Sequence, residues 1–225
     1  VVFWNNRNAR RKQSGTLIWW FKEWMESNNL QGKVQLIMHT EPKDPHGQDL
    51  NQIVERLDLN NREVLFSTQK MPFESMCALY NLADVTVNIS DAEGFGLATL
   101  ESLACGVPIV VTKTGGLQEQ VKRGKEEYGV GINPTSKVVI GSQQVPYIYE
   151  DRVDKAQFHS ALTKIYSMGH AARREMGLQG RDHVMKNYNF IDFKSRWIDL
   201  IDGVIENGSH ETRTGYNGIR FKEVA

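Results

Sequence analysis

The sequence has no excess of charge of either sign, few cysteines and no long apolar run. Its 225 residues carry 27 lysines and arginines and 27 aspartates and glutamates, so no net field favours nucleic acid or an anionic membrane as a partner. The two cysteines, Cys77 and Cys105, show no metal or disulfide spacing, and we expect buried, reduced thiols. No apolar stretch reaches the roughly 18 to 20 residues of a membrane span, and no signal segment is found. These absences predict a cytoplasmic protein whose anion sites are local.

Short apolar runs alternate with segments of helical periodicity along most of the chain. The runs cover residues 1–4, 34–38, 63–66, 84–89, 107–112 and 129–132. Helical patterns of roughly 10 to 15 residues lie between strands in parallel sheets. The sequence therefore predicts an α/β fold, a Rossmann-like doubly wound parallel sheet of about six strands.

The carboxyl-terminal third departs from this alternation. Residues 133–150 form a polar excursion that ends in Tyr147 and Tyr149, which we expect to pack in the core, although a role near an acceptor is the alternative. Three helical patterns follow, at residues 151–168, 171–188 and 190–205. We expect one domain over residues 1–206 and a polar, disordered tail over 207–225. Because the chain starts in a strand without methionine, it reads like the middle of a longer protein.

The stretch from Ser90 to Gln120 is the one around which the other segments are organised. After the apolar run at 84–89 come Gly94 and Gly96, and a helical pattern begins at Leu97. A helix that begins after glycines leaves its first N–H groups unpaired and its positive dipole end exposed, which favours an anion such as phosphate. The glycines let that anion approach the main chain closely.

Two glutamates flank this turn. Glu101 would lie about five residues into the helix, roughly 7 to 8 Å along its axis, which leaves room for a sugar ring between it and a phosphate. Its carboxylate can accept two hydrogen bonds from a ribose diol. Glu93 precedes the turn and would face whatever is attached at the other end of the phosphates.

The same stretch resembles the donor-binding motif of retaining glycosyltransferases of the GT-B fold, in the large family four (group 1). The shared features are a glutamate, Gly-Phe-Gly-Leu, a second glutamate, then Ala-Cys-Gly-Val-Pro-Ile-Val-Val and Thr-Gly-Gly. The resemblance covers nearly all of residues 1–206 and implies one lobe of a GT-B enzyme, the carboxyl-terminal one. It implies that Glu93 contacts hydroxyls of the transferred sugar, that the amides of Phe95 to Leu97 meet the diphosphate, and that Glu101 holds the ribose.

A basic loop follows the first apolar run. Residues 5–15 carry four positive charges, which indicates an anion partner; a solvated charge run is the alternative. In the resembling family an arginine and a lysine five residues later, here Arg7 and Lys12, neutralise the donor diphosphate, and Arg11 also fits the common form of the loop. The Gln-Ser-Gly that follows Lys12 departs from the family pattern.

The resemblance also implies that main chain near Met71 approaches the nucleobase. Main-chain recognition leaves no side-chain signature, so the sequence does not distinguish uracil, guanine and adenine as the base of the donor. The sequence contains no Asp-X-Asp pair, the arrangement that would hold a divalent metal, and we expect neither a metal nor another cofactor.

The function that this resemblance implies is hexose transfer from a nucleotide-diphosphate sugar to an unidentified acceptor. A GT-B enzyme also needs an amino-terminal lobe, which would be a missing or separate partner here, so the isolated lobe should bind nucleotide and transfer little. Two other functions share the fold, a nucleotide-sugar-binding module without catalysis and a nucleotide-sugar epimerase.

The motif has three alternative interpretations. A hydrolytic carboxylate pair stands about 5 to 9.5 Å apart, whereas Glu93 and Glu101 would be roughly 12 Å apart if both were helical. A dinucleotide fingerprint would need a glycine where Thr99 stands. A purely structural turn with solvated glutamates would be the default for either glutamate alone.

Overall fold

A computed structural model describes residues 1–206, so the tail expected over 207–225 lies outside the described residues. The chain divides into two compact units, Val1–Val184 and the part from Met185 onward. The candidate site lies wholly within the first unit. The expected extent of one domain over residues 1–206 stays a prediction.

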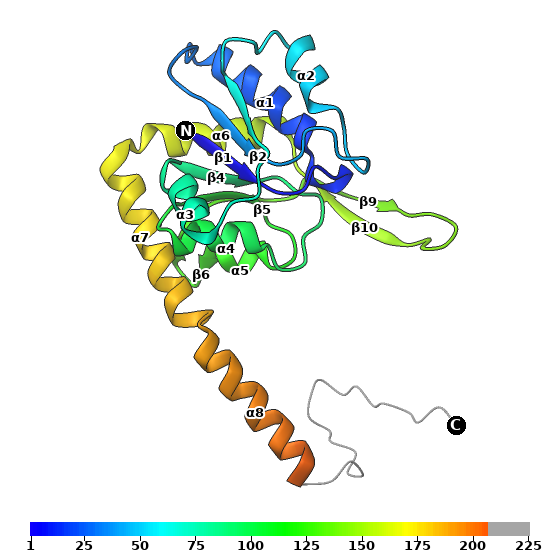
Figure 1. The fold of residues 1–225 in the computed structure, drawn as a ribbon, viewed down its shortest axis with the longest axis vertical. Helices are drawn as coiled ribbons and strands as arrows, with labels where there is room; N and C mark the ends of the chain where they lie inside the picture. Colours follow the sequence, from blue (N-terminus) through cyan, green and yellow to red (C-terminus); the bar gives the residue numbers. More distant parts are fainter. Residues whose placement is uncertain (207–225) are drawn as a thin grey trace. The chain divides into compact units, whose positions relative to one another are not determined.

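The first unit is built on a six-stranded sheet in the order β3-β2-β1-β4-β5-β8 (Figure 1). Every neighbouring pair is parallel. The strands are β1 (Val2–Asn5), β2 (Leu36–His39), β3 (Val64–Ser67), β4 (Val85–Asn88), β5 (Ile109–Thr112) and β8 (Gly129–Ile132). The predicted doubly wound parallel sheet is therefore confirmed. All four residues of β4 and of β5 are buried, as expected of central strands covered on both faces.

Helices cover both faces of the sheet. Figure 1 shows α1, α2 and α6 on one side and α3, α4 and α5 on the other. The helices are α1 (Ser14–Ser27), α2 (Leu50–Arg56), α3 (Phe73–Asn81), α4 (Leu97–Ala104), α5 (Leu117–Val121), α6 (Lys155–Ser167) and α7 (Gly169–Asn187). On α1, Leu17, Ile18 and Phe21 are fully buried, which is the helical spacing that the sequence showed.

The strand order reverses between β1 and β4. The chain leaves β1 toward β2 on one side and enters β4 on the other, so the loops after β1 and β4 diverge from adjacent strands. In open α/β sheets this is where ligands bind, at the carboxyl ends of the strands. Here the two loops are the basic loop and the glycine turn.

An antiparallel hairpin of β9 (Ser136–Ile140) and β10 (Ile148–Arg152) extends from the first unit (Figure 1). Tyr147 and Tyr149 are 76% and 63% exposed, so the prediction that they pack in the core was wrong. A two-stranded ribbon has no second layer over most of its length, and on β10 only Glu150 is buried. A second, very short hairpin pairs β6 (Lys122–Arg123) with β7 (Glu126–Glu127).

The second unit contains α8 (Phe190–Glu206), the last of the three helices that the sequence predicted. Asn189 caps it, since its side-chain oxygen accepts from the main-chain N–H of Asp192 at 2.9 Å. Along the described chain, none of the helices combines the length and apolar character that crossing a bilayer requires. Cys77 and Cys105 are both free thiols and half-buried.

Candidate functional site

The glycine turn after β4 adopts a conformation that requires glycine. Gly96 is the residue before α4 and has a φ of 85°, in the left-handed region. A Cβ at Gly96 would lie 2.5 Å from Cδ2 of Leu117. Within residues 1–206 no side chain caps the helix that begins there, so its first N–H groups are available to an anion.

A second pair of glycines supports this turn from behind. A Cβ on Gly115 would lie 1.7 Å from the carbonyl oxygen of Glu93, so the two main chains are in direct contact. The N–H of Gly116 donates to the carbonyl of Gly94 at 2.8 Å. The side chain of Gln120 donates to the next carbonyl of the turn at 2.6 Å. These hydrogen bonds occupy carbonyl groups of the turn on the side that packs against the second pair of glycines. The opposite side of the turn is open to a ligand.

A cavity of about 430 Å³ opens in front of the turn. Seven of the predicted site residues line it, namely Arg7, Lys12, Glu93, Phe95, Gly96, Leu97 and Glu101, together with Asn5, Asn6 and Ala98. Three predicted residues, Arg11, Met71 and Gly94, are not part of its lining. Within residues 1–206, no cluster of three or more His, Cys, Asp or Glu side chains is placed to hold a metal ion.

Lys12 and Glu93 form an ion pair in the lining of this cavity. Both side chains are almost fully enclosed, with 8% and 11% of their surfaces exposed. Burial lowers the pKa of Lys12, while the hydrogen bond and charge of Glu93 act in the opposite direction. A lysine in such a place needs an anion beside it, and in this structure Glu93 is that anion.

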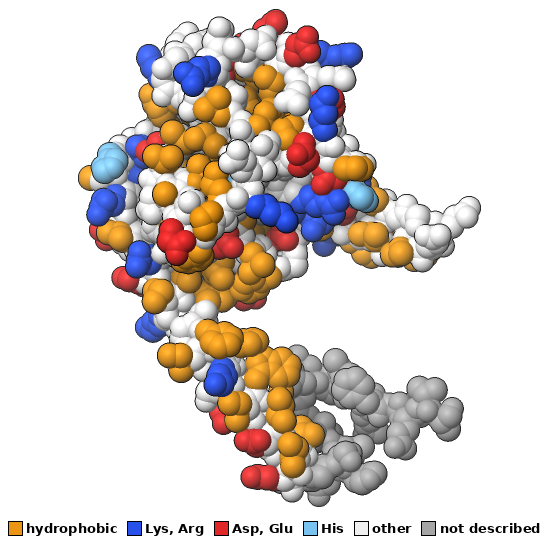
Figure 2. Space-filling model, in the orientation of Figure 1, with side chains coloured by type: hydrophobic (Ala, Val, Ile, Leu, Met, Phe, Trp, Pro, Cys, Tyr) orange, Lys and Arg blue, Asp and Glu red, His pale blue; other side chains and the backbone are white. Residues whose placement is uncertain are grey.

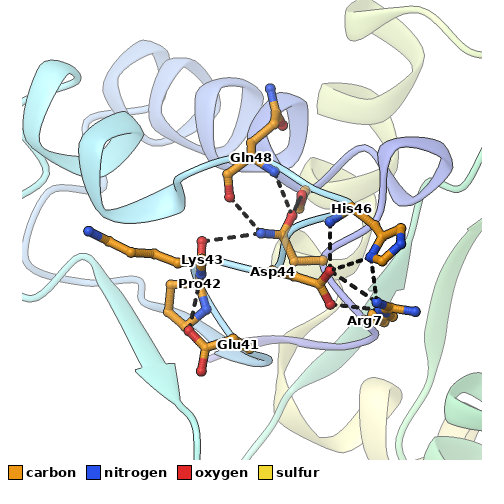
Figure 3. Close-up of polar contacts among 9 residues, drawn as sticks. Arg7, Glu41, Pro42, Lys43, Asp44, His46 and Gln48 are labelled. Atoms are coloured by element: carbon orange, nitrogen blue, oxygen red, sulfur yellow. Dashed lines mark hydrogen bonds and ion pairs between the residues drawn. The ribbon is translucent and has the colours of Figure 1, made fainter.

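Arg7 is directed toward a different carboxylate (Figure 3). Its Nε and Nη2 donate to the two oxygens of Asp44 at 2.6 and 3.1 Å, and Nη2 also contacts Nδ1 of His46 at 2.8 Å. The hydrogen bond from Arg7 is the main reason that the pKa of Asp44 is lowered to about 2. Arg7 therefore lines the cavity, but its guanidinium is held by the loop after β2.

A buried asparagine fixes the basic loop against that same loop. Asn8 is fully buried, and its Nδ2 donates to the carbonyls of Pro42 at 3.2 Å and Gln48 at 2.7 Å. Its Oδ1 accepts from the hydroxyl of Ser14 at 2.7 Å. Since all of its partners lie in loops or at the start of α1, Asn8 determines the path of the chain that carries Arg7 and Lys12.

Glu101 is held by a tyrosine that the sequence analysis missed. The hydroxyl of Tyr80 is 2.8 Å from Oε2 of Glu101 and 2.9 Å from the carbonyl of Ala98, and it accepts from Nδ2 of Asn5 at 2.8 Å. Tyr80 is 1% exposed, and burial raises its pKa, so the hydroxyl stays protonated. The only signal in the sequence was a tyrosine on the apolar side of a helix, which normally indicates core packing.

Comparisons with known proteins show the family and the fold. The family model described as glycosyl transferases group 1 matches residues 45–182. N-acetyl-α-D-glucosaminyl L-malate synthase of Bacillus anthracis is 26% identical over 115 residues, which are 51% of this chain and 29% of that protein.

Two solved structures share the fold. Sucrose-phosphate synthase from Thermosynechococcus elongatus has a TM-score of 0.71 and 24% identity, over 92% of this chain and 46% of that chain. An Anabaena protein in complex with UDP has a TM-score of 0.67 and 17% identity, over 90% of this chain and 48% of that one. The chain thus spans about half the length of these structures, and its fold is that of one GT-B lobe. Because the family model covers more than half of the sequence, this chain belongs to the glycosyl transferases group 1 family.

Proposed function

We propose that this chain is the donor-binding lobe of a retaining glycosyltransferase that transfers a hexose from a nucleotide-diphosphate sugar. The observation that carries the proposal is that one cavity collects Lys12, the uncapped start of α4, and Glu101. These are a cation, a row of main-chain donors and a carboxylate. A diphosphate followed by a ribose would need these groups in this order.

Donor binding in this proposal is an exchange of partners at Lys12. In the structure the ammonium is paired with one carboxylate, that of Glu93. A diphosphate brings more negative charge and more acceptor oxygens to the same place, and it also accepts from the N–H groups at the start of α4. Glu93 is then released to accept hydrogen bonds from the hydroxyls of the transferred sugar.

The catalytic contribution is electrostatic. As the glycosidic bond breaks, negative charge grows on the departing diphosphate, and Lys12, Arg7 and the start of α4 stabilise it. Glu93 orients the sugar and is not a nucleophile in this route. The acceptor attacks on the face from which the diphosphate leaves, which retains the configuration of the sugar. No metal and no other cofactor is part of the proposed route.

The acceptor would be supplied by a second lobe. The two solved structures are about twice as long as the part that this chain matches. We expect the described lobe alone to bind the donor and to transfer little sugar, because the acceptor would need the second lobe in order to bind. A lobe supplied by the same or by another chain would restore transfer.

Calorimetry with nucleotides tests the proposal. UDP is the first choice because the similar Anabaena structure contains it, and GDP and ADP complete the panel. One of the three should bind, and at about 100 times its Kd it should stabilise the protein by roughly 2.7 kcal/mol. Lys12→Ala should weaken binding of the diphosphate and leave binding of the matching nucleoside unchanged. The proposal fails if none of the three binds, or if both ligands lose affinity equally.

A further inference from the structure

A network of buried charges lies beside Lys12 and Glu93, at the end of the cavity where the proposal places the diphosphate (the phosphate end). The network is outside the cavity lining. Its two carboxylates, Asp91 and Glu150, are each 3% exposed. They come from segments far apart in the sequence, one just before the glycine turn and the other on β10. Burying a carboxylate is unfavourable unless charged or hydrogen-bonding groups surround it. Both carboxylates have such partners.

Glu150 is paired with two arginines. Nη2 and Nη1 of Arg10 donate to its two oxygens at 2.5 and 3.0 Å, in the two-pronged geometry that only a guanidinium provides. Arg152 donates to Oε2 of Glu150 at 3.1 Å. The hydrogen bond from Arg10 is the main reason that the pKa of Glu150 lies below its ordinary value.

Asp91 joins this pair to two other segments. Its carboxylate lies 2.7 Å from Nη1 of Arg152 and accepts from the side chain of Gln13 at 2.6 Å. Its main-chain N–H donates to the carbonyl of Arg11 at 2.8 Å, and its carbonyl accepts from the N–H of Asp151 at 2.8 Å. Asp91 therefore connects the basic loop, the segment that leads to Glu93, and the base of the β9–β10 hairpin.

The contact between Glu150 and Arg10 joins β10 to the turn of the basic loop that also carries Lys12. Arg10 and Lys12 are the two ends of a single 3-10 turn, Arg10–Lys12. That turn is closed by the N–H of Lys12, which donates to the carbonyl of Ala9 at 2.8 Å. A turn this short moves as one piece, so the anchor at Arg10 also sets the direction of Lys12. Figure 2 shows lysine and arginine side chains gathered beside the root of the hairpin.

We propose that Glu150 is a positioning residue for the phosphate end of the donor site, an inference that rests on the function proposed above. Through Arg10 it holds the 3-10 turn in the orientation that presents Lys12 to the cavity. The β9–β10 hairpin is thereby part of the donor site, although none of its residues lines the cavity. Apolar packing could anchor a hairpin, but paired charges also fix its direction and register.

The experiment compares three single variants of the whole chain by calorimetry, with the nucleoside diphosphate that binds and its nucleoside. Glu150→Gln removes a negative charge and one strong acceptor. Arg10→Lys keeps the positive charge but cannot make both bonds. Asp151→Asn is the matched control, because it removes a negative charge from the next residue of β10. Among the described residues the ion-pair partner of this carboxylate is the exposed Lys137, at 3.8 Å.

Positioning and simple charge make opposite predictions for Glu150→Gln. If only charge mattered, losing a carboxylate would tighten diphosphate binding in both acid-to-amide variants. Positioning requires that Glu150→Gln and Arg10→Lys raise the diphosphate Kd by roughly three- to tenfold, the scale of coupling between contacting charged residues. The nucleoside Kd and the binding by Asp151→Asn should stay within about twofold of wild type.

Other results overturn the inference. Wild-type affinity in both Glu150→Gln and Arg10→Lys would refute it and leave the proposed function intact. Equal loss for diphosphate and nucleoside would refute it as well, since that is the behaviour of a general structural defect. If wild type bound no nucleotide, the proposed function would fail and this inference with it. Should Glu150→Gln not fold, Arg10→Lys decides, because Arg10 is 57% exposed and its charge is retained.

Discussion

The two ends of the cavity hold their glutamates by different chemistry. At the end where the proposal places the diphosphate, the phosphate end, Glu93 lies against the buried ammonium of Lys12. At the end where the proposal places the ribose, the ribose end, Glu101 accepts from the neutral hydroxyl of Tyr80 at 2.8 Å. The first carboxylate is paired with a cation before any ligand arrives, whereas the second is hydrogen-bonded to an uncharged group.

This difference assigns each end a different role in the proposed function. The phosphate end must break an internal ion pair to accept a diphosphate, so its residues affect both stability and binding. The ribose end is already prepared to accept hydrogen bonds, and a change there should affect binding more than folding. The predictions below test this contrast from the largest expected effect to the smallest.

Removing the ammonium at the phosphate end should have the largest effect. Lys12→Met leaves Glu93 enclosed without its cation, and breaking a buried pair in this way costs about 3 kcal/mol of unfolding free energy. Urea denaturation measures the loss. The double variant Lys12→Met with Glu93→Gln should recover most of it, because no unpaired charge remains. A loss well under 1 kcal/mol in the single variant would show that water solvates the carboxylate of Glu93 in place of Lys12.

Removing the charge at the ribose end should spare stability and reduce affinity. A hydrogen bond to a charged group contributes about 1.5 to 3 kcal/mol, so Glu101→Gln should weaken ribonucleotide binding by roughly tenfold or more. The 2′,3′-dideoxy nucleotide is the control ligand, because it has no diol to lose. Its affinity should be the same for wild type and variant. Equal losses of affinity for both ligands would mean that Glu101 does not bind the ribose diol.

Much of this arrangement follows from local sequence. The six strands could be predicted because central parallel strands are continuous apolar runs, as in Ile109–Thr112. The glycine turn could be predicted because Gly96 needs a positive φ and close packing. Periodicity and glycine requirements are both properties of neighbouring residues, which a single sequence displays.

Contacts between distant residues could not be predicted in the same way. The hydrogen bond of Arg7 to Asp44, 37 positions away, has no signal in the sequence. Glu150 lies 140 positions from Arg10, and neither residue type indicates its partner. Tyr149 was placed in the core because tyrosine commonly packs there, yet its ribbon has no layer to cover it. The motif indicates most of the residues that line the cavity, but not which internal partner each one has.

A smaller effect is expected from the hydroxyl that holds Glu101. Tyr80→Phe removes the acceptor for Asn5 and the donor to Glu101, and it should cost about 1 kcal/mol of unfolding free energy. Diphosphate affinity at the Lys12 end should not change.

The pH dependence of stability gives this prediction a second measurement. The pKa of Tyr80 is raised by burial, so its contribution is fully present below about pH 10, the ordinary tyrosine value, and is lost as pH rises further. Alkaline destabilisation should therefore be shallower in Tyr80→Phe. Identical curves for variant and wild type above about pH 10 would contradict the burial of this hydroxyl.

The smallest effect is expected at Arg7, an exposed arginine that must exchange partners. Arg7 lowers the pKa of Asp44 to about 2, so the pair stabilises the fold above the ordinary aspartate pKa of about 3.9 and is lost as pH falls through about 2. If a bound diphosphate takes the guanidinium, Asp44 loses the main cause of this shift and its pKa rises toward the ordinary range. Carbon NMR of the carboxyl groups, with and without nucleotide, measures the change. Asp49 is the internal control, because the main-chain N–H of Gln52 chiefly lowers its pKa and no arginine is involved. An unchanged Asp44 titration in the nucleotide complex would mean that Arg7 stays with Asp44 and that Lys12 and α4 bind the diphosphate without it.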